Sequence, residues 1–202
     1  MTARSFPPAV PAVSGLCQAG RVSEPERTTD GRFLLIGGRR WRASDPTIPD
    51  TLRTELVAEL MAARRAVRDA SGDEDLTAAA RRRVQDAKVA LGERGEPWWE
   101  PPSAAGQRER LAAAVRALLE HRKPEATICP SDAARVAGGT SWRDAMDAAR
   151  SVAAELASVD VVEVRQHGAK VDPATATGPL RIARGPAWGD GQPSGGDQPD
   201  GG

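Results

Sequence analysis

Two consecutive stretches of the sequence carry the same spacing of apolar residues, and this repeat constrains the fold more than any other feature. In both stretches the apolar positions are separated by 4, 4, 3 and 4 residues; they are Leu52, Leu56, Leu60, Ala63 and Val67, and then Leu76, Ala80, Val84, Ala87 and Leu91. This spacing places one apolar stripe along each of two α-helices. Only Ser71-Gly72-Asp73 separates them, so we predict an antiparallel helix pair.

The charged residues between these stripes, in AARRAVRDA and ARRRVQDA, are expected on a solvated face, where arginines pair with acids. Before the helix pair, RFLLIGGRRWRAS predicts a β-hairpin, because Gly37-Gly38 can adopt the positive φ angles of a two-residue turn. A lone hairpin is marginally stable in water. We therefore expect it to pack on the helix pair through Phe33 and Trp41.

The second half of the chain predicts three helices followed by two strands. The helices are expected over 107–122, over Ser131–Gly138 and from Ser141 onward, with Trp142 heading the buried stripe of the third. The strands are expected over 161–166 and 179–184. Their alternation sets an inward group of Val162, Val164, Leu180 and Ile182 against an outward group of Val161, Glu163, Arg165 and Arg181. This order of elements is typical of a winged helix-turn-helix domain.

The sequence thus predicts a mainly α protein of the α+β class with disordered termini. We divide it into a disordered N-terminal segment (1–30), a β-hairpin plus helical-hairpin module (31–95), a Trp/Pro linker (96–106), a winged-helix-like domain (107–185) and a disordered Gly/Pro/Asp tail (186–202). The two end segments hold too little apolar surface to offset the entropy of ordering the chain.

Composition argues against several classes of protein. The 28 basic and 28 acidic residues balance, so the whole chain has no net attraction to nucleic acid or acidic lipid. No apolar run approaches the ~20 residues of a membrane helix, and prolines interrupt any signal-peptide core near the N-terminus. Two cysteines, Cys17 and Cys129, are too few for a disulfide scaffold. We expect a cytoplasmic protein with no membrane contact.

No set of residues has the spacing of a catalytic or metal site. Cys129 lies just before a predicted helix, where the helix dipole favours a thiolate. However, His121 and His167 lie far from it in the sequence, and Cys-Pro-Ser is also an ordinary helix start. No CxxC or HxxxH pair and no phosphate-binding glycine motif occurs. We therefore expect no enzymatic activity, no metal, no cofactor and no small-molecule substrate.

Part of the chain resembles a known bacterial family. TICPSDAARVAGGTSWRDAM and GAKVDPATATGPLRIARG are similar to the domain of unknown function three-two-five-three, through Cys129-Pro130-Ser131, Trp142-Arg143 and the segment 171–179. The resemblance covers about residues 107–185, implies a winged-helix-like fold and carries no catalytic residues. The first half resembles a region that accompanies this domain in actinobacterial proteins, which often bear the automatic label "biopolymer transporter Tol". Neither a membrane span nor a repeat array supports transport.

Two hypotheses of function stay open. In the first, the protein binds duplex nucleic acid, weakly and with little sequence preference, as a nucleic-acid-binding or regulatory protein. The predicted contacts are basic residues of the C-terminal hairpin, namely Arg165, His167, Lys170, Arg181 and Arg184. The third helix carries Asp144, Asp147 and Glu155, which would repel phosphates, so the hairpin is expected to make the contact.

In the second hypothesis the protein is an adaptor that binds a protein partner, and the winged helix is only a scaffold. Trp98 and Trp99 in the linker are the predicted partner-binding anchors. Adjacent tryptophans carry a large apolar surface, so the same pair can instead act as a clamp between the two halves of the chain.

Overall fold

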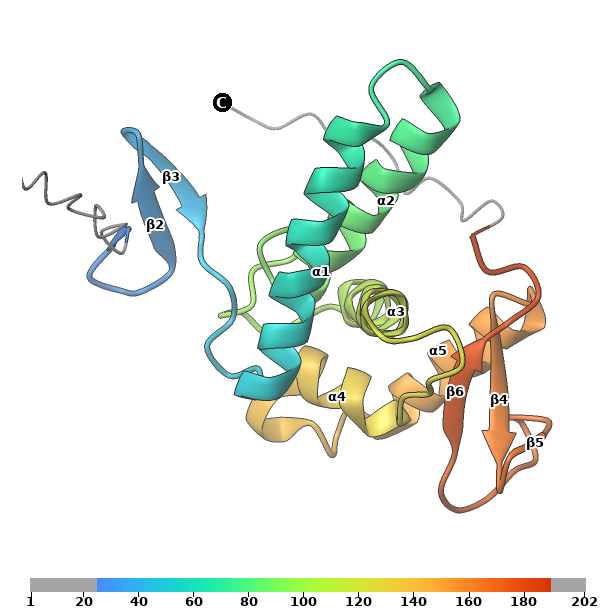
Figure 1. Ribbon diagram of the computed structural model, residues 1–202. Coiled ribbons are helices and arrows are strands. Elements are labelled where there is room, and N and C mark those ends of the chain that lie inside the picture. The colour runs from blue at the N-terminus through green and yellow to red at the C-terminus, as the bar shows by residue number, and fades with distance from the viewer. Residues whose placement is uncertain (1–24, 190–202) are drawn as a thin grey trace, which may run out of the picture.

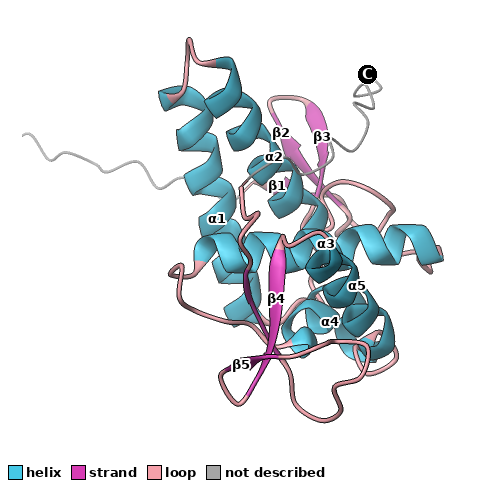
Figure 2. Ribbon diagram, turned by 90° about the vertical axis from the view of Figure 1, so that its right-hand side faces the viewer, coloured by secondary structure: helices cyan, strands magenta, loops and turns pink. Residues whose placement is uncertain are grey.

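The computed structural model describes residues 25–189. Predictions for residues 1–24, including Cys17, and for the tail from residue 190 onward lie outside the described residues. The described chain forms five α-helices, one 3₁₀ helix and two three-stranded antiparallel sheets. The two sheets lie at opposite ends of the helical body (Figures 1 and 2). The mainly α class with small antiparallel sheets is confirmed.

The helix pair forms as the apolar repeat predicts, with α1 over Asp50–Asp69 and α2 over Glu74–Ala90. Leu76, predicted as the first apolar residue of the second stripe, is however exposed. Asp73 caps α2, because its Oδ1 accepts a hydrogen bond of 3.0 Å from the backbone N–H of Leu76. Gly92 follows the end of α2 with φ of 78°, a conformation that glycine adopts without strain. None of the described helices is both long and apolar enough to cross a membrane.

The N-terminal sheet has the strand order β1-β2-β3, with β1 over Glu26–Arg27, β2 over Phe33–Ile36 and β3 over Arg39–Arg42. The Gly37-Gly38 turn is confirmed, with φ of 58° and 76°. β1 was not expected, because residues 1–30 were predicted to be disordered. The expected anchoring of the hairpin through Trp41 is wrong, since 46% of this residue is exposed.

Helix α3, over Ala104–His121, lies at the centre of the helical body, where Figure 1 shows it end-on. It packs against α1, α2, α4 and α5. Its apolar residues Leu111, Val115 and Leu118 are fully buried. The buried apolar residues form one cluster, whose members range from Ile48 to Ile182 along the chain. The helix pair and the C-terminal half therefore share a single hydrophobic core.

The remaining helices are α4 over Pro130–Gly138, the 3₁₀ helix η1 over Gly139–Ser141 and α5 over Met146–Ser158. The third helix was expected to begin at Ser141, but turns occupy residues 142–145. Trp142 therefore lies before α5 and is only partly buried. The guanidinium carbons of Arg135 and Arg143 lie 4.6 and 4.5 Å from the centre of its ring. Trp142 was expected to head the buried stripe of the third helix; it packs on the core, but it precedes α5 and is only partly buried.

The C-terminal sheet has the strand order β5-β4-β6, with β4 over Val162–Gln166, β5 over Ala169–Lys170 and β6 over Arg181–Arg184. Ile128, between α3 and α4, forms a β-bridge with Ile182 through backbone hydrogen bonds of 2.9 and 2.8 Å. The predicted inward residues are buried, but Val161, predicted to point outward, is buried as well. Just beyond β6, Trp188 packs on the core within the segment that was predicted to be disordered.

Candidate nucleic-acid interface

Three basic side chains form a row across the C-terminal sheet. The strand register pairs Arg165 with Lys170 on one side and with Arg181 on the other. Residues directly opposite each other project from the same face of a sheet, so the three lie side by side on the face that looks away from the core. The structure thus brings together three of the five predicted contacts. We call Arg165, Lys170 and Arg181 the basic row.

Glu163 lies beside the basic row and neutralises part of its charge. Its Oε2 accepts hydrogen bonds of 3.1 and 2.8 Å from Nε and Nη2 of Arg165. Its Oε1 lies 3.9 Å from the Nζ of Lys170, which is also 3.9 Å from Oδ1 of Asp160. Like charges directly opposite each other destabilise a strand pair, and Glu163 offsets part of that repulsion. The side chain of Lys170 is 61% exposed and accessible to an anion.

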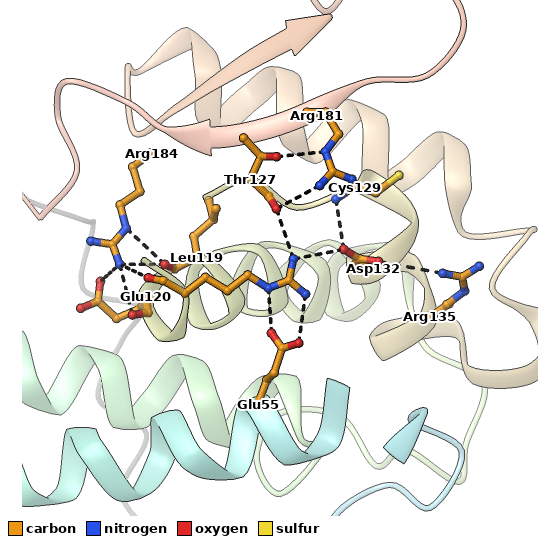
Figure 3. A network of polar contacts seen from close by, with 10 residues as sticks. Glu55, Leu119, Glu120, Thr127, Cys129, Asp132, Arg135, Arg181 and Arg184 are labelled. Atoms are coloured by element: carbon orange, nitrogen blue, oxygen red, sulfur yellow. Dashed lines mark hydrogen bonds and ion pairs between the residues drawn. The ribbon is translucent and has the colours of Figure 1, made fainter. Parts of the chain in front are cut away.

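Arg181 is held by the chain between α3 and α4 (Figure 3). Its Nε donates a hydrogen bond of 2.9 Å to Oγ1 of Thr127, and its Nη2 donates one of 3.3 Å to the Thr127 carbonyl oxygen. These bonds fix the direction of the guanidinium, while the residue stays exposed. Arg181 therefore presents an oriented charge at the edge of the basic row.

Arg184 does not belong to this surface. Its guanidinium donates hydrogen bonds to the carbonyl oxygens of Leu119, Glu120 and Arg122, at 2.7–3.2 Å, and lies 5.1 Å from the ring of Trp188. The last carbonyls of a helix lack partners within the helix and attract cations. Arg184 thus caps the C-terminal end of α3 (Figure 3). The prediction that it contacts nucleic acid has no support in this geometry.

His167 lies at the tip of the C-terminal hairpin, exposed and two residues after Arg165 of the basic row. It has φ of 51° and Gly168 has φ of 86°, so the two form the predicted tight turn. The acids predicted on the third helix are exposed, with Asp144 in the turn before α5 and Asp147 and Glu155 on it. Glu155 pairs with Arg108 of α3. With Arg150 as its basic residue, α5 has a net charge of −1.

The predicted partner-binding residues, Trp98 and Trp99, are half-buried and make contacts within the chain. The Nε1 of Trp98 donates a hydrogen bond of 2.9 Å to the carbonyl oxygen of Ala43. The ring of Trp99 lies 5.5 Å from Phe33 and 5.2 Å from Trp98, edge to face in both cases. The pair therefore joins the N-terminal sheet to the linker.

Sequence reasoning missed the buried ion pairs between helices. Asp86 was expected on a solvated face, yet both Asp86 and Glu59 are buried. Nε and Nη2 of Arg83 donate hydrogen bonds of 2.8 and 3.1 Å to Glu59, and Arg116 pairs with Asp86 through both of its carboxylate oxygens. A signal was present for Glu59, because it lies three residues after Leu56 and four before Ala63, on the same helix face as the apolar stripe.

Burial raises the pKa of Glu59, while the hydrogen bonds from Arg83 lower it in part. Burial likewise raises the pKa of Asp86, against the opposing effect of Arg116. Both acids are engaged in pairs that hold helices together, which gives these shifts a structural origin. Within residues 25–189, no group of three or more His, Cys, Asp or Glu side chains is placed to bind a metal ion.

Comparison with protein families shows what the second half of the chain is. Residues 108–185 match the model of a family described as a protein of unknown function, DUF3253. We call this segment the DUF3253 domain, after the family that it matches. The DUF3253 domain begins inside α3 and ends just after β6, so it includes the basic row, whereas α1, α2 and the N-terminal sheet lie outside it. A search of curated proteins finds no match to the chain.

Proposed function

We propose that this protein is a non-enzymatic nucleic-acid-binding protein whose DUF3253 domain, arranged like a winged helix, binds the phosphate backbone of a duplex. The observation that carries the proposal is the basic row across the C-terminal sheet. The basic row lies on a hairpin that follows three helices. In a winged-helix domain the strand pair at this position reaches the nucleic-acid backbone. His167 at the hairpin tip is a further contact to the same backbone.

Electrostatics supports a phosphate as the group bound there. Of the three neighbouring cations, Arg165 and Lys170 pair with Glu163, and Lys170 also lies 3.9 Å from Asp160, so a further anion would relieve the repulsion that remains. A phosphate supplies that charge. Backbone phosphates look alike in every sequence, and the exposed Asp144 and Asp147 would repel phosphates if the third helix approached the bases. The proposed binding is therefore weak and sequence-tolerant.

The adaptor hypothesis receives less support. Trp98 and Trp99, its predicted anchors, contact Ala43 and Phe33 of the same chain, so a partner would have to displace these contacts. We also propose a cytoplasmic location, because a reducing compartment fits the free thiol of Cys129.

The test is a fluorescence-anisotropy titration with a labelled DNA duplex over a range of salt concentrations. About three phosphate contacts give a slope of log affinity against log salt near −2.7, at about 0.9 for each phosphate. Replacing Arg165, Lys170 and Arg181 together by Ala is expected to abolish most of that slope. The matched control replaces three exposed arginines of α1, Arg64, Arg65 and Arg68, by Ala.

The control variant removes the same charge from another surface and is expected to bind like the wild type. The proposal fails if the wild type does not bind the duplex at tens of micromolar protein, on the order expected for non-specific contacts. It also fails if the control and the basic-row variant lose affinity equally, because net charge alone would then explain the binding.

A further inference from the structure

One face of the N-terminal sheet carries an exposed aromatic ring between basic side chains. The register pairs Leu34 with Trp41 and with Arg27, and pairs Ile36 with Arg39. Since directly paired residues share a face and alternate residues along a strand do too, these five residues lie on one side. We call it the outer face. Ile36 is 50% exposed, and Trp41 is almost equally accessible.

The opposite face of this sheet attaches it to the rest of the molecule. There, Phe33 stacks edge to face on Trp99, and Nη1 of Arg42 donates a hydrogen bond of 2.8 Å to the carbonyl oxygen of Gly95. Arg42 also lies over the ring of Trp99, at 5.5 Å. These contacts fix the sheet from one side, while the outer face is contacted by Lys88 of α2 and keeps Ile36 and Trp41 half exposed.

The outer face is basic and carries no acid. Arg27 and Arg39 belong to it, and the Nζ of Lys88, from the end of α2, lies 5.6 Å from the centre of the Trp41 ring. The one acid in these strands, Glu26, pairs with Leu35 and so belongs to the opposite face. Unlike Arg165 in the basic row, the side chains of Arg27 and Arg39 have no acidic partner among the described residues.

We propose that the outer face binds single-stranded nucleic acid, with a base stacked on Trp41 and phosphates bound by Arg27 and Arg39. Ile36 and Leu34 provide the apolar surface beside the stacked base. Stacking on an aromatic ring next to a basic track is how proteins hold single strands without sequence preference. In a duplex the faces of the bases are already stacked on one another, so this surface selects single strands.

Sheet geometry places the charges at a suitable distance from the ring. Arg27 lies two strands away from Trp41, or about 10 Å between backbones, and Arg39 lies two residues along the same strand, or about 7 Å. Both side chains are long enough to reach phosphates on either side of a base that covers the ring. The surface combines the charges of Arg27 and Arg39 with the exposed ring of Trp41. An acidic peptide would contact only the charges, whereas a nucleic acid would contact the charges and stack on the ring, so a nucleic acid fits the surface better.

This inference goes beyond the function proposed above, because it concerns a surface outside the DUF3253 domain and another form of nucleic acid. The test uses the full chain and labelled 12-nucleotide oligo-dT and oligo-U, titrated by anisotropy over a range of salt concentrations. Trp41→Ala is expected to weaken binding roughly 5- to 150-fold, the range measured for loss of one stacked base. Trp41→Phe is expected to retain most of the affinity, since it keeps an aromatic face.

Replacing Arg27 and Arg39 together by Ala is expected to reduce the salt slope by about 1.4, at about 0.7 for each single-strand phosphate. The control variants are Leu76→Ala, an exposed apolar residue of α2, and a double replacement of Arg64 and Arg65 by Ala. Both controls are expected to bind like the wild type. All variants change exposed side chains, so their melting temperatures are expected to match the wild type, and this is measured first.

Binding of either 12-mer that depends on Trp41 supports the proposal. It is overturned if neither 12-mer binds, if Trp41→Ala binds as tightly as the wild type, or if the outer face binds anionic phosphatidylglycerol vesicles instead of the 12-mers. Loss of single-strand binding in the basic-row variant, with Trp41→Ala unaffected, also overturns it. The duplex titration separates the two proposals. Binding of the duplex but not of the 12-mers supports only the DUF3253 site, and binding of the 12-mers but not of the duplex supports only the outer face.

Discussion

The two sheets of this protein are built alike and positioned differently. Each has three antiparallel strands and a two-residue turn with positive φ angles, at Gly37-Gly38 in one and at His167-Gly168 in the other. In the C-terminal sheet, Val164 and Ile182 are fully buried. In the N-terminal sheet, every residue of β2 keeps some exposure although all four are apolar. Apolar composition alone therefore does not decide which sheet enters the core.

The difference comes from what lies against each sheet. α5 packs on β4, and Ile128 extends the edge at β6, so the C-terminal sheet closes one end of the core. The N-terminal sheet is held by the Trp98–Trp99 pair of the linker and by single contacts such as that of Lys88. A hairpin turn sets which strands pair, whereas the surrounding helices determine how much of the sheet is buried. The first sheet is consequently free to present its outer face.

The largest difference between the two sheets is expected when one isoleucine in each sheet is replaced. Ile182→Ala is expected to lower the free energy of unfolding by about 2–5 kcal/mol, because it leaves a cavity in the core. Ile36→Ala is expected to change it by less than about 0.5 kcal/mol, because that side chain is half exposed. Urea denaturation followed by circular dichroism measures both. Equal losses would mean that the two sheets contribute equally to the core.

A second test removes one arginine from each sheet. Arg184→Met is expected to lower the free energy of unfolding by about 1–3 kcal/mol, because it leaves the last carbonyls of α3 without their donor. Arg42→Met removes the hydrogen bonds to the carbonyl oxygens of Gly95 and Glu96 and the contact with the Trp99 ring, in a more exposed setting. Its expected cost is below about 1 kcal/mol. A similar cost for both variants in the same denaturation assay would contradict the capping role of Arg184.

A third test uses pH, because a chain of charges links the C-terminal sheet to the helix pair. Glu59 pairs with Arg83, whose Nε lies 3.5 Å from Glu120, and Glu120 accepts a hydrogen bond of 3.0 Å from Nε1 of Trp188. Because burial raises the pKa of Glu59 in the folded state, its contribution to stability is greatest below its ordinary value of 4.5 and falls as the pH rises through the raised pKa.

The variant Glu59→Gln does not titrate, so its stability relative to the wild type is expected to improve as the pH rises from about 4 to 7. Urea denaturation at several pH values measures this relative change, whatever the constant cost of weakening the pair with Arg83. Asp86→Asn is expected to change in the same direction, since burial also raises the pKa of Asp86. A stability difference that stays constant over this range would refute the pKa shift.

The smallest effect is expected from the turns. A Cβ added at Gly37 or Gly168 would meet no atom within 4 Å, so Gly→Ala at either position tests only the backbone conformation. The left-handed region costs an alanine about 1–2 kcal/mol. Gly168→Ala is expected to lower global stability by up to about that amount. Gly37→Ala is expected to leave global stability nearly unchanged and to speed amide hydrogen exchange in the N-terminal sheet, which can open locally.

Much of the fold could be predicted because its signals are local. The apolar repeat, the Asp73 cap, Gly92 and the Gly37-Gly38 turn each depend on a few neighbouring residues, and the structure confirms them. The start of the third helix was wrong, because turns form where Ser141 appeared to begin a helix. Burial of Asp86 could not be read from the sequence, since its partner Arg116 belongs to another helix.

The site was predictable in part. A two-residue turn at His167-Gly168 sets the pairing of Arg165 with Lys170, so these two were deducible as neighbours. The pairing with Arg181 was not, because the loop that returns the chain to β6 is long and its register comes from contacts with Ile128. Arg184 was misassigned although its alternation with Ile182 places it on the core side of the sheet.

The position of α3 has a consequence for how such domains can be exchanged between proteins. The family match begins inside α3, yet the same helix presents Leu111 and Val115 to the shared core and pairs Arg116 with Asp86 of α2. A DUF3253 domain cut at that boundary would expose apolar surface and leave the partly buried Arg116 without its acid. In any other protein whose DUF3253 domain begins with such a helix, another part of the chain must pack against that side of the helix. The unit that can be transplanted as a stable piece is therefore larger than the unit that sequence similarity outlines.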